Sequence, residues 1–117
     1  MTREQFKTRT KAFALRAIKV AESLPADASA QIIGRQLIRS ATSTAANYRA
    51  AVRSKSRADF VAKMGIVEEE CDESLFWLEL LTDTGEIKPA SLTSLMKEGD
   101  EILSIVVASI KTACRGS

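Results

Sequence analysis

Hydrophobic residues recur along this chain at spacings of three and four, which is the period of an amphipathic α-helix. The pattern is interrupted at Leu24-Pro25, at the polar stretch 54–57 and at Asp83-Thr84-Gly85. A residue before proline is pushed out of helical geometry, and glycine suits the left-handed position after a helix. The periodicity predicts helices over residues 3–23, 29–54, 57–83 and 91–114.

Capping signals support two of these helix starts. Thr2 with Gln5, and Ser56 with Asp59, have the spacing at which a hydroxyl side chain accepts a hydrogen bond from the third backbone N–H of a helix. Helices of roughly 20–25 residues joined by short loops are typical of an antiparallel up-down-up-down four-helix bundle. We therefore predict an all-α fold in which residues 1–117 form a single domain.

The segment 29–54 organises this prediction, because it carries three faces instead of two. Its broad apolar arc includes Leu37, Ala41 and Tyr48. A second face bears four arginines at helical spacing: Arg35, Arg39, Arg49 and Arg53. Between these faces runs a strip of small and polar residues: Gln36, Ser40, Ser43, Asn47, Ala50 and Ser54.

The arginine face has two interpretations. It is either a solvated face that pairs with acids of a neighbouring helix, or a track that binds nucleic-acid phosphates. The small strip is either a tight intramolecular helix crossing or a subunit contact, in which Ser43 and Asn47 take part. Trp77 lies outside the main apolar stripe of 57–83, so it either widens the core or belongs to a second contact surface.

Charge is distributed unevenly along the chain. Residues 1–60 hold 12 Lys and Arg against 4 Asp and Glu, a net charge of +8, whereas residues 61–117 hold 5 against 11, a net charge of −6. Arg39 and Glu73 fall near the middle of adjacent antiparallel helices, and we predict a structural ion pair between them. If Arg39 pairs in this way, the phosphate track is left with the other three arginines.

Catalytic chemistry is missing from the sequence. The chain contains no histidine, no glycine-rich phosphate loop and no zinc-type cysteine spacing, and Cys71 and Cys114 form no disulfide framework. Within the acidic cluster 68–73, only Glu69 or Glu70 could converge with Glu73 on a metal, and a solvated acidic face is the better interpretation. We predict no enzyme activity, no cofactor and no metal. Without a signal peptide or a long apolar span, we also expect no membrane contact and a cytoplasmic location.

Three stretches of the chain are similar to a known family. The pattern L-I-R-S-x-x-S-x-x-A-N at 37–47, S-R-x-D-F at 56–60 and E-E-x-D-E-S-x-x-W-L-E-L-L at 69–81 resemble the four-helix-bundle proteins encoded by intervening sequences of large-subunit ribosomal RNA genes. The family pattern falls on Arg39, Ser43, Asn47, Ser56, Phe60 and Glu73. The chain departs from it at Ala50-Ala51, where many members carry Glu-Gly, so its second helix continues further.

The resemblance also carries implications for assembly and partners. The family is similar in fold to the accessory variability determinant of diversity-generating retroelements. Both imply a homopentameric barrel with a basic surface, and the retroelement protein binds nucleic acid and a reverse transcriptase. We therefore predict a homo-oligomer that serves as a scaffold for RNA or DNA, using the four arginines of segment 29–54 with Lys or Arg residues of the first helix. The alternative is a scaffold for a protein partner, with no role in nucleic-acid binding.

Overall fold

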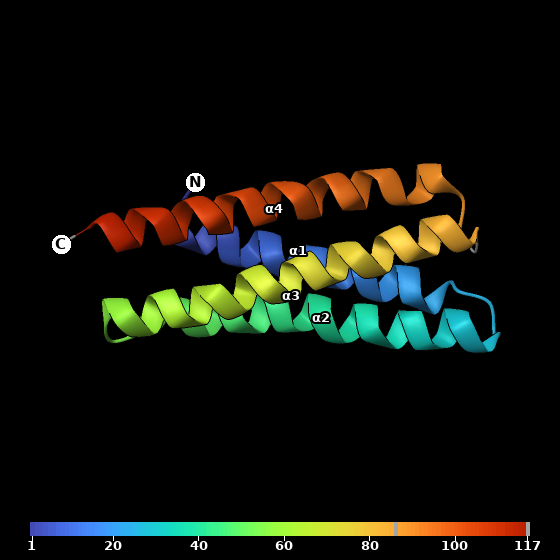
Figure 1. Cartoon of the computed structure of the whole chain (residues 1–117), viewed down its shortest axis with the longest axis horizontal. Coiled ribbons are helices and arrows are strands. Elements are labelled where there is room, and N and C mark those ends of the chain that lie inside the picture. The colour runs from blue at the N-terminus through green and yellow to red at the C-terminus, as the bar shows by residue number, and fades with distance from the viewer. Residues whose placement is uncertain (86, 117) are drawn as a thin grey trace.

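Four antiparallel helices make up the computed structural model, which describes residues 1–85 and 87–116 apart from the side chain of Ser91 (Figure 1). The predicted all-α four-helix bundle is confirmed. The helices are α1 (Arg3–Glu22), α2 (Ala28–Val52), α3 (Arg57–Thr84) and α4 (Pro89–Arg115).

Side-chain caps mark the starts of α1, α2 and α3. The Thr2 hydroxyl accepts a hydrogen bond from the Gln5 backbone N–H at 3.0 Å, and the Gln5 side chain accepts one from the Thr2 N–H at 2.9 Å. The Ser56 hydroxyl caps α3 by accepting a hydrogen bond from the Asp59 backbone N–H, and Gly85, the residue after α3, has a left-handed φ of 74°. These satisfied backbone groups explain why the expected boundaries lie within two residues of the observed ones.

Two boundaries differ from the prediction by two residues. α2 passes through Ala50-Ala51 and ends at Val52, short of the expected residue 54. α4 begins at Pro89 and not at residue 91, because the fixed φ of proline suits the first turn of a helix.

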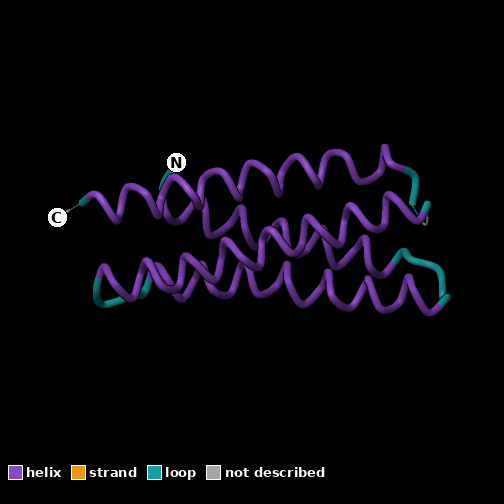
Figure 2. Tube along the Cα trace, in the orientation of Figure 1, coloured by secondary structure: helices purple, strands orange, loops and turns teal. Residues whose placement is uncertain are grey.

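The bundle is an elongated body of 50 × 21 × 20 Å with both chain ends at the same end (Figure 1). Its three loops are short and lie at the bundle ends (Figure 2). Consecutive helices pack along their lengths, whereas α1 and α4 form the least extensive seam. Among the described residues, no helix is long and apolar enough to cross a membrane.

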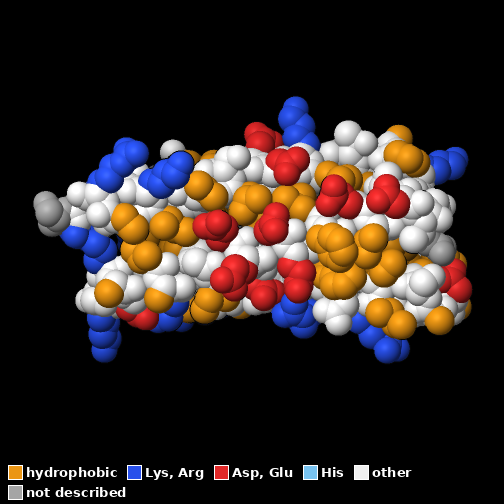
Figure 3. Space-filling view, in the orientation of Figure 1, with side chains coloured by type: hydrophobic (Ala, Val, Ile, Leu, Met, Phe, Trp, Pro, Cys, Tyr) orange, Lys and Arg blue, Asp and Glu red, His pale blue; other side chains and the backbone are white. Residues whose placement is uncertain are grey.

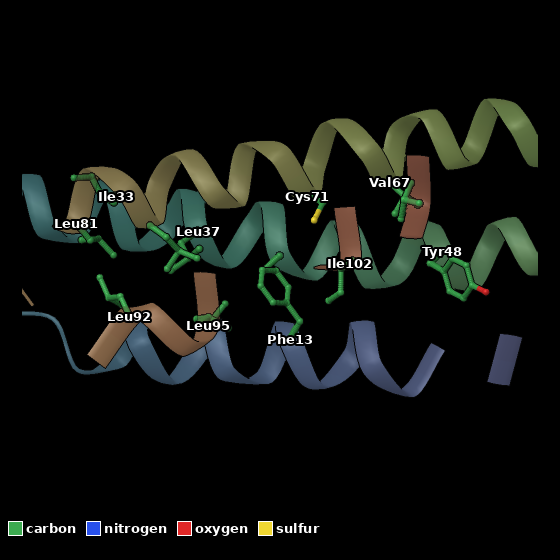
Figure 4. Close-up of a cluster of buried hydrophobic side chains, with 14 of the residues drawn as sticks. Phe13, Ile33, Leu37, Tyr48, Val67, Cys71, Leu81, Leu92, Leu95 and Ile102 are labelled. Atoms are coloured by element: carbon green, nitrogen blue, oxygen red, sulfur yellow. The ribbon is translucent and has the colours of Figure 1, made fainter. Parts of the chain in front are cut away.

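Buried apolar side chains from all four helices fill the interior along its whole length (Figure 4). Phe13, Cys71 and Ile102 meet near the middle, and none of them is exposed to solvent. Burial raises the pKa of the Cys71 thiol to about 12, so at neutral pH this thiol is protonated and behaves as a small apolar group.

The face formed by α3 and α4 is acidic in its middle part (Figure 3). Basic side chains project from its edges and ends, and an apolar patch lies over the C-terminal half of α3. The basic first half and the acidic second half of the sequence thus correspond to different helices. α1 and α2 carry most of the basic residues, and α3 and α4 carry most of the acids.

Candidate nucleic-acid interface

A groove of about 640 Å³ runs between α1 and α2. Its floor and walls include small or apolar side chains, among them Ala45 and Ala46 of α2. Their small side chains keep the floor low, so the longer side chains at the rim rise above it. The groove therefore results from helix packing, because alanine side chains are too small to fill the space between α1 and α2.

Basic side chains line this groove from both helices. Lys7 and Lys11 come from α1, and Arg49 comes from α2. Thr8 and Thr42 add hydroxyl groups, while Glu4 places one carboxylate at the same groove and Lys7 pairs with it at 3.5 Å. The Lys11 and Arg49 side chains are exposed to solvent, so their charges are available to an anionic partner.

The structure divides the four arginines predicted as one track. Arg49 lies beside the groove, whereas Arg35 of α2 and Arg53, the residue after α2, are exposed outside its lining. Arg39 faces α3, where its Nη1 donates to Glu70 at 3.2 Å and its Nη2 donates to Glu73. Arg39 is thus engaged in ion pairs and is not a free member of the track.

Arg39 and Glu73, predicted to pair, are brought together at the α2/α3 seam. The side chains are 51% and 37% exposed, respectively, so the pair lies at the surface. Glu70 and Glu73, one of the two acid pairs considered as convergent metal ligands, instead converge on the Arg39 guanidinium. Within the described part of the chain, His, Cys, Asp and Glu form no group of three or more suited to a metal ion.

The strip of small residues on α2 separates into buried and half-buried parts. Ser40 is fully buried and accepts a hydrogen bond from the Ser74 hydroxyl of α3 at 2.8 Å. Ser43 and Asn47 are half-buried, and the Asn47 amide donates to the Ser43 carbonyl and hydroxyl oxygens, each at 2.9 Å. The strip therefore serves the α2/α3 crossing at Ser40, while Ser43 and Asn47 keep one side toward the surface.

Trp77 is half-buried and packs against the core from α3. Its indole N–H is buried and has no acceptor among the described residues. The ring of Phe76 lies 5.0 Å from the Trp77 ring, edge to face, and is 48% exposed. Phe76, which the sequence pattern did not single out, is thus the more accessible aromatic side chain of this surface.

Some residues of the interface could have been found in the sequence. Lys7 and Lys11 are four residues apart, the spacing that places two side chains on one helix face. The ion pair between Arg9 and Glu98, in contrast, joins α1 to α4 with two contacts of 2.7 Å across 89 positions of the chain. No local signal marks such a pair, because its register depends on how all three loops place the helices.

The fold and the charged groove define the class of this protein as an all-α four-helix bundle with a basic helix pair. The chain belongs to the family of 23S rRNA-intervening sequence proteins, whose family pattern matches residues 4–108. The structure is also similar to the crystal structure of a protein with unknown function from the S23 ribosomal protein family of Bacteroides thetaiotaomicron, with a TM-score of 0.87. The two sequences are 32% identical, and the similarity covers 95% of this chain and 99% of the other. Among curated proteins, none matches this chain.

Proposed function

We propose that this protein is a non-enzymatic, homo-oligomeric scaffold that binds the phosphate backbone of nucleic acid through the α1/α2 groove. The observation that carries the proposal is the convergence of Lys7, Lys11 and Arg49 on one groove. Cations supply most of the affinity for a nucleic-acid backbone. Because the family description names 23S rRNA, structured RNA is the first nucleic acid to test.

The remaining arginines of α2 have different roles in this proposal. Arg35 and Arg53 extend the basic face on either side of the groove, since Arg35 is exposed on α2 and Arg53 is exposed directly after it. Arg39 contributes less, because Glu70 and Glu73 offset its charge. The proposed track is therefore centred on Arg49, with the lysines of α1 in place of Arg39.

Self-association would place several copies of this site in one assembly. The resemblance to the family implies five copies, and a ring of copies that each bind weakly gains avidity when several sites contact one nucleic acid. For the subunit contact we propose the half-buried Ser43 and Asn47 on α2, together with Trp77 on α3. Exposed Phe76, beside Trp77, supports an interface at the latter position, because exposed aromatic residues are enriched at protein contacts.

A salt series tests the nucleic-acid proposal. Binding to structured RNA and to duplex DNA is measured by fluorescence anisotropy from about 50 to 200 mM salt, a range over which phosphate contacts weaken steeply. The double variant Lys11→Glu/Arg49→Glu should abolish binding without changing the assembly mass. The matched control Lys88→Glu/Lys97→Glu reverses the same number of charges at two exposed residues, one directly before α4 and one within it, and should retain binding. Equal loss in both variants, or no binding at low salt, would overturn the proposal.

A protein–protein scaffold without a nucleic-acid role is the second candidate. It is favoured by the apolar patch over the C-terminal half of α3, where Phe76 is exposed (Figure 3). Binding to this patch would persist at high salt, because it depends on apolar area. If Phe76→Ser removes a partner that Lys11→Glu/Arg49→Glu retains, the protein–protein function replaces the first.

A further inference from the structure

A second groove, of about 780 Å³, opens at the end of the bundle where both chain ends lie. The N-terminal turns of α1 and α3 and the C-terminal turns of α2 and α4 contribute to it. Its size falls within the range of small-molecule sites, which is roughly 300–1,000 Å³. It is distinct from the α1/α2 groove, because the two share no lining residue.

The floor of this groove is aromatic and apolar. The rings of Phe6 and Tyr48 contact each other edge to face, with centroids 4.7 Å apart, and each residue is only 4% exposed. Phe60 and Ile105 continue this surface from α3 and α4. The Tyr48 hydroxyl points away from the other labelled core side chains (Figure 4). Burial raises the pKa of this hydroxyl, which therefore remains a hydrogen-bond donor at neutral pH.

The rim of the groove is basic. Arg3, Lys55 and Arg57 line it, and all three residues are exposed. The Arg3 guanidinium carbon lies 5.0 Å from the centroid of the Phe60 ring, so an aromatic face holds this cation beside the opening. The N-termini of α1 and α3 and the C-termini of α2 and α4 meet here, so the helix dipoles offset one another and the side chains supply the positive charge. Acidic residues are missing from the described lining.

We infer that this end groove binds a nucleotide with a terminal phosphate monoester, placing the phosphate against Arg3, Lys55 and Arg57 and the base and sugar over the floor of Phe6, Tyr48 and Phe60. Guanidinium and ammonium groups are the usual partners of phosphate, and aromatic side chains commonly stack on a base. The nucleotide is either free or the phosphorylated 5′ end of a strand, since both present the same chemistry.

The polar lining favours a nucleotide over an acyl chain. Ser109 and Thr112 of α4 bring hydroxyl groups to the groove. These groups can bond a sugar or a base edge, whereas an acyl chain would leave them without partners, which costs free energy. The inference goes beyond the proposed function, because it requires neither Arg49 nor the lysines of α1.

Tyr48 provides the probe for the test, because it is the only tyrosine of the chain. In protein labelled with ¹³C in the tyrosine ring, one set of signals reports on the groove floor. Titration with 5′-AMP should shift this set saturably, and adenosine and inorganic phosphate should each bind more weakly by about tenfold or more, since each lacks half of the contacts. A 5′-phosphorylated oligonucleotide and its 5′-hydroxyl counterpart then distinguish a strand end from a free nucleotide.

Charge reversal at the rim completes the experiment. Arg3→Glu/Lys55→Glu should raise the Kd for 5′-AMP about tenfold or more, whereas the control Lys11→Glu/Arg49→Glu should leave it unchanged. The first pair is exposed, and an acid near a helix N-terminus is tolerated, so both variants should fold. Arg3→Ala/Lys55→Ala serves as a second test if the reversed variant does not fold.

No shift with 5′-AMP, equal affinity for adenosine, or an unchanged Kd in the rim variants would overturn the inference. Because the control variant addresses the other groove, failure here leaves the proposed function standing.

Discussion

The hydroxyl of Ser74 on α3 donates a hydrogen bond of 2.8 Å to the hydroxyl of Ser40 on α2, and both side chains are fully buried. Ser40 also donates to the Leu37 carbonyl at 3.3 Å, and Ser74 approaches the Glu70 carbonyl at 2.9 Å. Each hydroxyl thus has partners on its own helix and across the seam. Their small size allows α2 and α3 to approach closely, and their mutual bond satisfies polar groups that water does not reach.

This pair predicts a non-additive mutational effect. Ser40→Ala or Ser74→Ala alone should lower the free energy of unfolding by about 1 kcal/mol, because each leaves a buried hydroxyl with fewer partners. The double variant should cost less than the sum, since it removes both hydroxyls together. Urea unfolding measures all three values, and strict additivity would contradict a direct contact.

The Arg39–Glu73 pair should contribute only modestly to stability. Both side chains are more than one third exposed, so solvent screens their attraction, and we expect a coupling of roughly 0.5 kcal/mol in a double-mutant cycle with alanine. Raising the salt concentration should reduce this coupling. If Arg39→Ala and Glu73→Ala both leave the melting temperature unchanged, a structural role for the pair is wrong.

Glu98 should give the protein a pH-dependent stability. Its hydrogen bonds from Arg9 lower the pKa of this carboxyl group below its ordinary value, against an opposing effect of burial. A carboxylate with a lowered pKa stabilises the fold above the unfolded pKa of about 4.3, and the contribution is lost as the pH falls through the lower, folded pKa. Glu98→Gln should therefore reduce stability at pH 7 by about 1 kcal/mol, and this difference should shrink below about pH 4.

Glu101 offers the matched control for that measurement. It lies 3.6 Å from Arg9 and its side chain is 54% exposed, compared with 20% for Glu98. Glu101→Gln should change the unfolding free energy by less than about 0.5 kcal/mol at either pH. An equal effect of both substitutions would mean that the Arg9–Glu98 contact has no special contribution.

Alanine substitution at two glycines should change the stability of the protein in opposite directions. A Cβ atom at Gly99 would lie 2.8 Å from Leu75 Cδ2 and 3.1 Å from Phe13 Cε1, so Gly99→Ala should destabilise the protein by about 1–2 kcal/mol through overpacking. At Gly65 a Cβ would meet nothing within 4 Å, and Gly65→Ala should stabilise α3 by about 0.5–1 kcal/mol. Thermal unfolding of the two variants tests the pair, and a stable Gly99→Ala protein would show that Leu75 moves aside without cost.

The sequence predicts the fold well because its signals are local. Helix period, capping residues and the left-handed Gly85 act over a few positions, so they locate α1 to α4 within two residues. The grooves are different in origin. They depend on how far apart neighbouring helices lie and how each is rotated, which is set by side-chain volumes such as those of Ala45 and Ala46. A face of four arginines could be found from spacing, but not the position of Arg39 beside two acids of α3.

The limited seam between α1 and α4 has a consequence for how the chain folds. Most tertiary contacts join helices that are consecutive in the sequence, and α1 with α4 is the pair that brings the two ends of the chain together. Low sequence separation of contacts favours rapid folding, because little loop-closure entropy is lost before contacts form. We therefore expect α2 and α3 to associate early and the Arg9–Glu98 seam to close last. Because this seam closes last, we expect it also to open first when the native bundle unfolds locally. Its opening would expose the interior while α2 and α3 stay paired.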